Sequence, residues 1–168
     1  DTLETREGQY VEPVQLQVFC NSLWEKLPAE GSEITEDDMR LVGDVSTSLG
    51  NYYAGRVKAV VDGAVAQRRG VKERDIRLWF ERKLIIDGRI RNMVAQEVGG
   101  KSGGLDDIVV QEFVKKGDLV RAEQRGGVTF YELTHDRLVE PIIENNREWL
   151  QDDLKNLSHL QSQAISWD

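Results

Sequence analysis

Few side chains in this sequence are suited to chemistry. The 168 residues contain one cysteine, Cys20, and two histidines, His135 and His159. A single cysteine excludes an internal disulfide and a cysteine-ligated zinc site, and two histidines leave few ligands for a metal centre. Adjacent acidic residues such as Asp106 and Asp107 do not face each other on a helix, so they are typical of caps and solvent-facing surfaces. We therefore predict neither a catalytic residue nor a metal site.

Gly100-Lys101-Ser102 matches the end of a phosphate-binding loop. That loop requires Gly-x-x-x-x-Gly-Lys-Ser/Thr between a buried strand and a helix, and here Ala95 stands at the first glycine position. Residues 93–98 would make a poor buried strand, and two further glycines interrupt the start of a helix. The sequence therefore favours a flexible glycine-rich loop between helices, and it leaves open whether this loop contacts a ligand.

His135-Asp136 indicates a different chemistry. The pair follows a predicted strand and precedes a predicted helix, for which Thr134 is the expected N-cap. The first turn of a helix has free backbone N–H groups and a positive dipole end, so it suits an anion and phosphate in particular. The structural alternative stays open, because any helix start uses residues such as Thr134 and Asp136, and His135 could simply hydrogen-bond a loop carbonyl.

The elements that would position these residues are mostly helices. Pro13 suits the first turn of a helix, and an apolar stripe with helical spacing follows it: Leu16, Phe19, Cys20, Leu23, Trp24 and Leu27. Further helices are predicted over about 35–42, from Asp44 onward, over 71–85 and over 105–116, while residues 89–98 are ambiguous. Cys20 and three tryptophans on apolar helical faces are expected in the core: Trp24, Trp79 and Trp149.

The clearest strand signal is a hairpin. Residues 119–125 and 128–133 flank Gly126-Gly127, which suits a two-residue turn, and this register pairs Arg121 with Glu132. The helix expected after Thr134 should be kinked at Pro141, because proline removes a backbone donor inside a helix. The predicted fold class is mainly α with a small β-hairpin. It consists of a flexible N-terminal segment (1–12), a helical domain (13–69), a winged-helix domain (70–147) and a C-terminal helical linker (148–168).

Charge restricts the partners. The net charge is −8 and the pI is about 4.9, whereas binding to nucleic acid needs a basic surface. No apolar run approaches the roughly 20 residues of a membrane span, and the first residues do not resemble a signal peptide. We expect a cytoplasmic chain that binds neither nucleic acid nor a membrane.

The stretch from Tyr131 to Ile142, YELTHDRLVEPI, resembles the end of the winged-helix domain in STAND signalling ATPases, the group that includes NACHT and NB-ARC proteins. More narrowly, it is similar to a bacterial branch of novel STAND ATPases, as are the stretches at 12–24, 77–81 and 157–161. The resemblance implies that His135 contacts the β-phosphate of ADP, with Thr134 and Asp136 in support. It also implies that Pro13 packs on the adenine.

The function that this resemblance implies is regulatory. The chain would help to hold a STAND ATPase in its ADP-bound, autoinhibited state without being an enzyme itself. ADP or ATP would be held by the intact parent protein and not tightly by these residues alone. The implied partners are an ATPase core in the same polypeptide, sensor repeats downstream, and other copies of the parent on activation.

Two alternatives remain. One is a winged-helix DNA-binding transcriptional regulator, which charge disfavours, because residues 105–116 carry a net charge of −1 and residues 118–127 are neutral. The other is a protein-interaction scaffold without a nucleotide role. The scaffold gains support if His135 and Pro13 do not face a common cleft.

Overall fold

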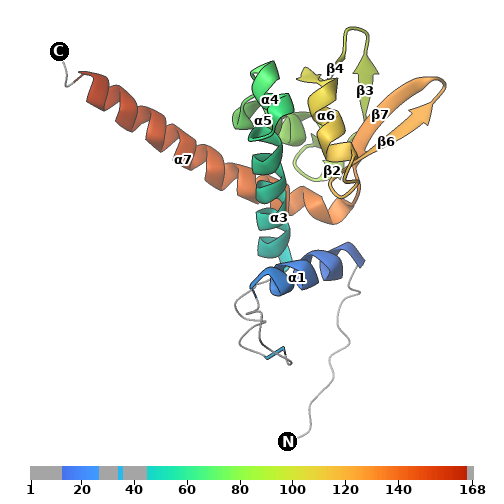
Figure 1. The fold of residues 1–168 in the computed structure, drawn as a ribbon, viewed down its shortest axis with the longest axis horizontal. Helices are drawn as coiled ribbons and strands as arrows, with labels where there is room; N and C mark the ends of the chain where they lie inside the picture. The colour runs from blue at the N-terminus through green and yellow to red at the C-terminus, as the bar shows by residue number, and fades with distance from the viewer. Residues whose placement is uncertain (1–12, 27–33, 36–44, 166–168) are drawn as a thin grey trace, which may run out of the picture.

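The computed structural model describes residues 13–26, 34–35 and 45–165 (Figure 1). The predicted flexible segment 1–12 and the predicted helix near 35–42 lie outside these ranges, apart from Thr35. The helices are α1 (Pro13–Lys26), α3 (Val45–Val61), α4 (Ala64–Arg69), α5 (Glu73–Lys83), α6 (Asp107–Val114), the short 3₁₀ helix η1 (Asp136–Leu138) and α7 (Val139–Ile165).

The strands form two antiparallel sheets. A small sheet pairs β1 (Ile85–Ile86) with β2 (Ile90–Arg91). The larger sheet has the order β5-β4-β3-β7-β6 and contains β3 (Val94–Glu97), β4 (Lys101–Ser102), β5 (Leu105–Asp106), β6 (Val120–Arg125) and β7 (Val128–Leu133). The predicted fold class, mainly α with a small β-hairpin, is therefore wrong, because the chain is α/β with a five-stranded sheet.

Segment 85–106 accounts for this difference. Its glycines form tight reversals where a flexible loop was predicted. The turn between β1 and β2 contains Asp87 with φ 52° and Gly88 with φ 65°, and four more residues with positive φ lie beside β4: Gly99, Gly100, Gly103 and Gly104. Strands of two to four residues are too short to show a recognisable period of two, so the sequence pattern could not identify them.

The β6–β7 hairpin was predicted with the correct register. Arg125 pairs with Val128 across the turn and Arg121 pairs with Glu132. The Arg121 guanidinium donates to Glu132, with 2.8 Å between Nε and Oε1. In Figure 1 this hairpin and the β3–β4 hairpin project on the side of the molecule opposite to the free end of α7.

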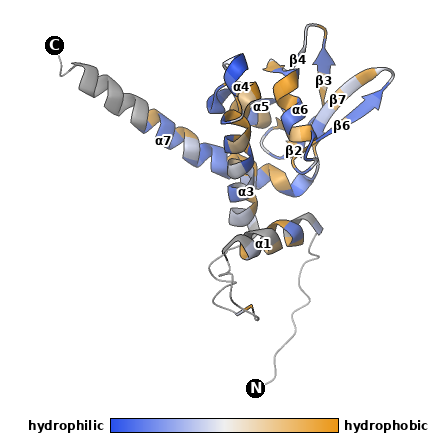
Figure 2. Ribbon diagram, in the orientation of Figure 1, coloured by the Kyte–Doolittle hydropathy of each residue, from blue (hydrophilic) through white to orange (hydrophobic). Residues whose placement is uncertain are grey.

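One contiguous core joins α3, α5, α6, α7 and the sheet. Phe80 lies at its centre and makes edge-to-face contacts with Tyr53 and Phe113, each with 5.1 Å between ring centroids. Trp79 is buried as expected, whereas Trp149 is only half-buried. Hydrophobic residues predominate in α6, which packs against α3, α4 and β6 (Figure 2).

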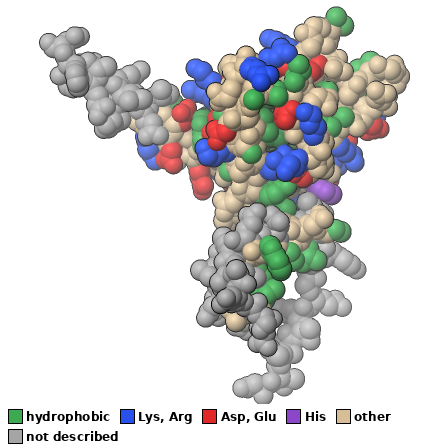
Figure 3. Space-filling model, in the orientation of Figure 1, with side chains coloured by type: hydrophobic (Ala, Val, Ile, Leu, Met, Phe, Trp, Pro, Cys, Tyr) green, Lys and Arg blue, Asp and Glu red, His purple; other side chains and the backbone are tan. Residues whose placement is uncertain are grey.

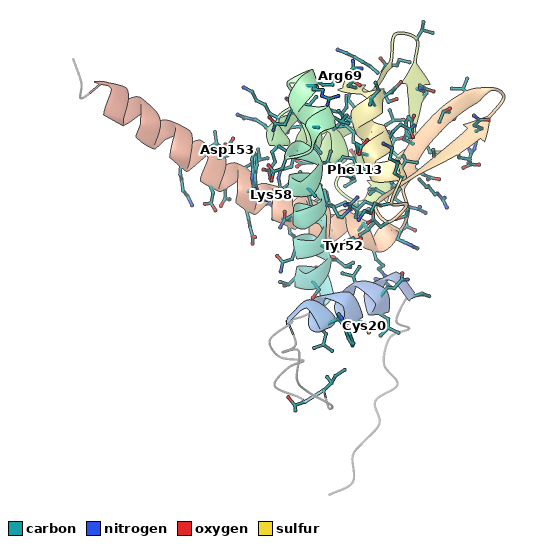
Figure 4. The ribbon with its side chains drawn as sticks, in the orientation of Figure 1. Cys20, Tyr52, Lys58, Arg69, Phe113 and Asp153 are labelled. Carbon is teal, nitrogen blue, oxygen red and sulfur yellow. The ribbon has the colours of Figure 1, made fainter. Side chains whose placement is uncertain are left out.

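Helix α1 forms where it was predicted but buries a different face. Val18 and Leu23 are buried, whereas Leu16, Cys20 and Trp24 are exposed, the last at 80%. Figure 4 shows Cys20 on the side of α1 that points away from α3. The predicted core positions of Cys20 and Trp24 are therefore wrong. Among the described elements α1 packs mainly against α3, and this neighbour covers only part of its apolar stripe.

Helix α7 starts later than expected, and this changes the role of Pro141. Because α7 begins at Val139, Pro141 stands in the first turn, where backbone N–H groups have no partner inside the helix. The expected kink therefore has no basis. None of the described helices is both long enough and apolar enough to cross a membrane.

Candidate functional site

The junction between β7 and α7 displays His135. This residue precedes η1 in an extended conformation, with φ −140° and ψ 142°, and its side chain is exposed. Thr134 is not the N-cap that the sequence suggested, because its hydroxyl donates to the carbonyl of Asp118 at 2.7 Å. The backbone N–H of Thr134 donates to the carbonyl of Leu119 at 3.0 Å. Thr134 therefore ties the start of the junction to the beginning of β6.

Arg91 of β2 ties the other parts of the junction together. Its Nη1 donates to the carbonyl oxygen of Leu133 at 2.8 Å and to that of Thr134 at 3.4 Å. Its Nε and Nη2 engage the carboxylate of Asp136. The same guanidinium lies 3.9 Å from Glu132 Oε2. The sequence analysis missed Arg91, because 45 residues separate it from Asp136 and no local pattern links the two.

A cleft of about 580 Å³ opens beside the junction. The β1–β2 turn contributes Gly88 and Arg89 to its lining, η1 contributes Asp136 and Arg137, and the start of α7 contributes Val139 and Glu140. Two guanidinium groups and two carboxylates therefore meet around it. The guanidinium of Arg89 is suited to holding an anion such as a phosphate, and Asp136 competes less for it because Asp136 pairs with Arg91.

Pro13 lies apart from this cleft. It is the exposed first residue of α1, and neither Pro13 nor His135 is among the residues that line the cleft, although the neighbour of His135, Asp136, is. The structure thus brings Thr134, His135 and Asp136 together at one junction and leaves Pro13 on another element. This arrangement weakens the part of the nucleotide hypothesis that required a shared cleft.

Gly100-Lys101-Ser102 forms the second half of the β3–β4 hairpin, so the expected flexible loop between helices is wrong. Ser102 is fully buried, and its hydroxyl donates to Asp107 Oδ1 at 2.5 Å. The carbonyl of Ser102 accepts a hydrogen bond from the Trp79 indole at 2.7 Å. A phosphate loop needs this hydroxyl free for the metal ion that accompanies the phosphates. The internal bonds of Ser102 therefore exclude this use.

The elements that would have met DNA are poorly suited to it. In the predicted groove helix, residues 105–116, the exposed residues are Ile108, Lys115 and Lys116, and Lys115 pairs with Glu112. On the hairpin, Arg121 pairs with Glu132 and Arg125 pairs with Glu123, and the hydrogen bond from Arg125 lowers the pKa of Glu123. Acidic and basic side chains are interspersed on the face shown in Figure 3. These pairs leave little unopposed positive charge for counterion release.

Within the described part of the chain, His, Cys, Asp and Glu residues form no group of three or more that could hold a metal ion. Comparison with models of known families, with characterised proteins and with solved structures finds no match to this chain.

Proposed function

We propose that this chain is a regulatory module of a STAND-type signalling ATPase and contributes to its ADP-bound, autoinhibited state. The observation that carries the proposal is the junction at His135. An exposed imidazole stands at the start of η1, with Arg91 and Thr134 holding the backbone around it. An exposed imidazole can donate to a phosphate group, and Arg89 and Arg137 line the adjoining cleft.

In this proposal the module acts through differential contacts. His135 binds the β-phosphate in the closed, ADP-bound state and loses this contact in the open state, so that its binding energy favours the closed state. The ATPase core of the same polypeptide supplies the remaining walls of the nucleotide site. Signals from sensor repeats downstream shift the population towards the open state, in which copies of the parent assemble. We further propose a cytoplasmic location and no enzymatic activity for this chain alone.

The adenine contact of Pro13 is a separate part of the proposal. Pro13 is exposed and therefore available to a ligand held by a neighbouring domain. Replacing Pro13 with Ala tests this part alone, since the change leaves the His135 junction intact.

The decisive experiment uses the polypeptide as it is encoded, with any segments that adjoin residues 1–168. His135→Ala should weaken the affinity for ADP by about tenfold, which corresponds to about 1.4 kcal/mol of binding free energy, and should lower the amount of ADP that copurifies. Lys58→Gln is the control, because Lys58 lies exposed on α3 and pairs with Asp62 one turn away (Figure 4). Equal ADP content in the His135→Ala variant and the control would contradict the proposal.

A protein-interaction scaffold without a nucleotide role is the second candidate, and a different observation favours it. Leu16 and Trp24 of α1 are 57% and 80% exposed, which is unusual for two large apolar side chains on one helix. In this case Trp24→Gln should abolish association with a partner and leave ADP retention unchanged. His135→Ala should then affect neither property.

A further inference from the structure

The contacts of Arg91 lie on both sides of His135. Before the histidine, the guanidinium holds the carbonyls of Leu133 and Thr134, and after it the carboxylate of Asp136. One side chain therefore bonds to the backbone before His135 and to the residue after it. A planar guanidinium with donors fixed in a fork is suited to holding several acceptors in one relative geometry.

The backbone around Arg91 is held by neighbouring elements. Its strand partner in the small sheet is the buried Ile85. The next residue, Asn92, donates from its backbone to the carbonyl of Leu84 at 2.8 Å and from its side chain to the carbonyl of Lys83 at 2.8 Å. The backbone of Arg91 is therefore fixed to the end of α5. Through its hydrogen bonds, the guanidinium in turn fixes the position of residues 133–136 relative to α5.

The exposure of the pair argues for a geometric role. The Asp136 side chain is 75% exposed and that of Arg91 is 23% exposed. Exposed ion pairs contribute little to the free energy of unfolding, because water and salt replace the interaction. A guanidinium that donates to two carbonyls and a carboxylate can still restrict the backbone conformations of residues 133–136.

We propose that Arg91 is the positioning residue of the His135 junction. It holds residues 133–136 in the conformation that presents the imidazole and makes the orientation of His135 depend on the β1–β2 hairpin. The cleft lies between that hairpin and η1, so a ligand that moves the hairpin also moves His135. The role in nucleotide retention rests on the proposed function, whereas the positioning itself can be tested without it.

The first test is NMR of the 168-residue chain with Arg91→Gln, Arg91→Lys and a control, Arg125→Gln. The control removes another forked, exposed pair, the one between Arg125 and Glu123, away from the junction. Arg91→Gln should shift the ¹³Cα signals of residues 134–136 towards random-coil values. It should also speed hydrogen exchange at the Leu138 amide, which donates to the His135 carbonyl, by about tenfold or more.

Arg91→Lys separates charge from geometry. Lysine keeps the attraction to Asp136 but cannot hold that carboxylate and both carbonyls at once, so its junction signals should lie between those of wild type and Arg91→Gln. The core signals of Tyr53 and Phe113 should stay unchanged in all variants. Junction signals like those of wild type in Arg91→Gln would overturn the proposal. So would a chain that unfolds in Arg91→Gln but has a wild-type junction in Arg91→Lys, because Arg91 would then be purely structural.

The second test measures ADP retention in the encoded polypeptide. Arg91→Gln should lower it towards the level of His135→Ala, and the double variant should lose no more than His135→Ala alone, because the two residues act as a unit. The two proposals fail in different ways. If His135→Ala retains all its ADP while Arg91→Gln still disorders the junction, the nucleotide role is wrong and the positioning stands. If His135→Ala loses ADP while the junction of Arg91→Gln is unchanged, the positioning is wrong.

Discussion

Arg77 and Arg91 each donate hydrogen bonds to several residues, but Arg77 is buried and Arg91 is partly exposed to solvent. Arg77 of α5 donates to Glu73 at 2.8 Å, to Asn145 at 2.8 Å and to Asn146 at 3.0 Å, so it connects one turn of α7 to α5. Arg91 likewise holds acceptors from several residues. The Arg77 side chain, however, is 3% exposed, whereas that of Arg91 is 23% exposed.

Burial separates the consequences of the two networks. The guanidinium of Arg77 also lies over the rings of Tyr53 and Trp149, 5.4 Å and 4.9 Å from their centroids. Water cannot replace a lost partner in such a place, so breaking the network leaves polar groups unsatisfied in a medium of low dielectric constant. Around Arg91 water is available. The buried network should therefore determine stability, and the exposed one should determine local geometry.

The largest expected effect comes from Arg77→Met, which keeps the apolar stem and removes the guanidinium. It should lower the free energy of unfolding by about 3–5 kcal/mol, because Glu73, Asn145 and Asn146 each lose the hydrogen bond from the guanidinium. Urea denaturation measures this. The matched control is Arg74→Met on the same helix, where a half-exposed arginine lies 3.8 Å from Asp153 and a loss below about 1 kcal/mol is expected. Equal losses in the two variants would break the comparison.

The next effect concerns a second buried polar pair. Ser102→Ala should lower the free energy of unfolding by about 1–3 kcal/mol, because the buried carboxylate of Asp107 then keeps only the hydrogen bond from Gln96 at 2.8 Å. A double-mutant cycle with Asp107→Asn should give a clear coupling energy between the two side chains. A coupling energy near zero would show that this buried contact does not act like those of Arg77.

Tyr53 tests the buried network through pH. Burial raises the pKa of its phenol, and the hydroxyl donates to Asn146 Oδ1 at 2.9 Å. The unfolded chain releases this proton near pH ~10 while the folded chain retains it, so stability falls as the pH rises above that value, by up to about 1.4 kcal/mol per pH unit. Tyr53→Phe should lose about 1 kcal/mol at neutral pH and show a shallower alkaline decline. Urea midpoints between pH 8 and pH 11 measure both effects. An unchanged alkaline slope in the variant would contradict this assignment.

The parts of the fold that could be predicted from sequence are those with local signals. The β6–β7 register follows from two strands of six residues around Gly126-Gly127, where turn chemistry and pairing agree. The helix predicted over 71–85 likewise corresponds to α5, and Trp79 on it is buried as expected. The short strands of segment 85–106 had no such signal. The buried face of α1 was also missed, because it depends on which neighbour packs against the helix.

The residues of the candidate site likewise fall into those that local sequence signals reveal and those that depend on tertiary contacts. His135 and Asp136 could be found because they are adjacent at the boundary between two recognisable elements. Arg91 could not be found, because its contacts depend on the β1–β2 hairpin bringing residue 91 beside residues 133–136. Nor could the sequence show that the Ser102 hydroxyl is used internally, since that contact requires the tight reversals on either side of β4.

The smallest expected effect concerns Arg121, which shares Glu132 with Arg91. The Arg121 side chain is 52% exposed, and its Nη2 lies 2.6 Å from Glu132 Oε1. Arg121→Gln should lower the free energy of unfolding by only about 0.2–1 kcal/mol, because the arginine is hydrated and the amide of glutamine can still donate to the carboxylate. Glu132 also keeps Arg91 at 3.9 Å as a second cation. Urea denaturation at low and high salt measures this, and the small loss should shrink further as salt screens the pair.

A salt-independent loss of 3 kcal/mol or more is the size expected for a buried ion pair. Such a loss would mean that the exposure of the arginine does not determine how much its ion pair contributes to stability. The 9% exposure of the Glu132 carboxylate would then be the deciding quantity. In that case Arg91, which approaches the same carboxylate, would contribute to the free energy of unfolding as Arg77 does.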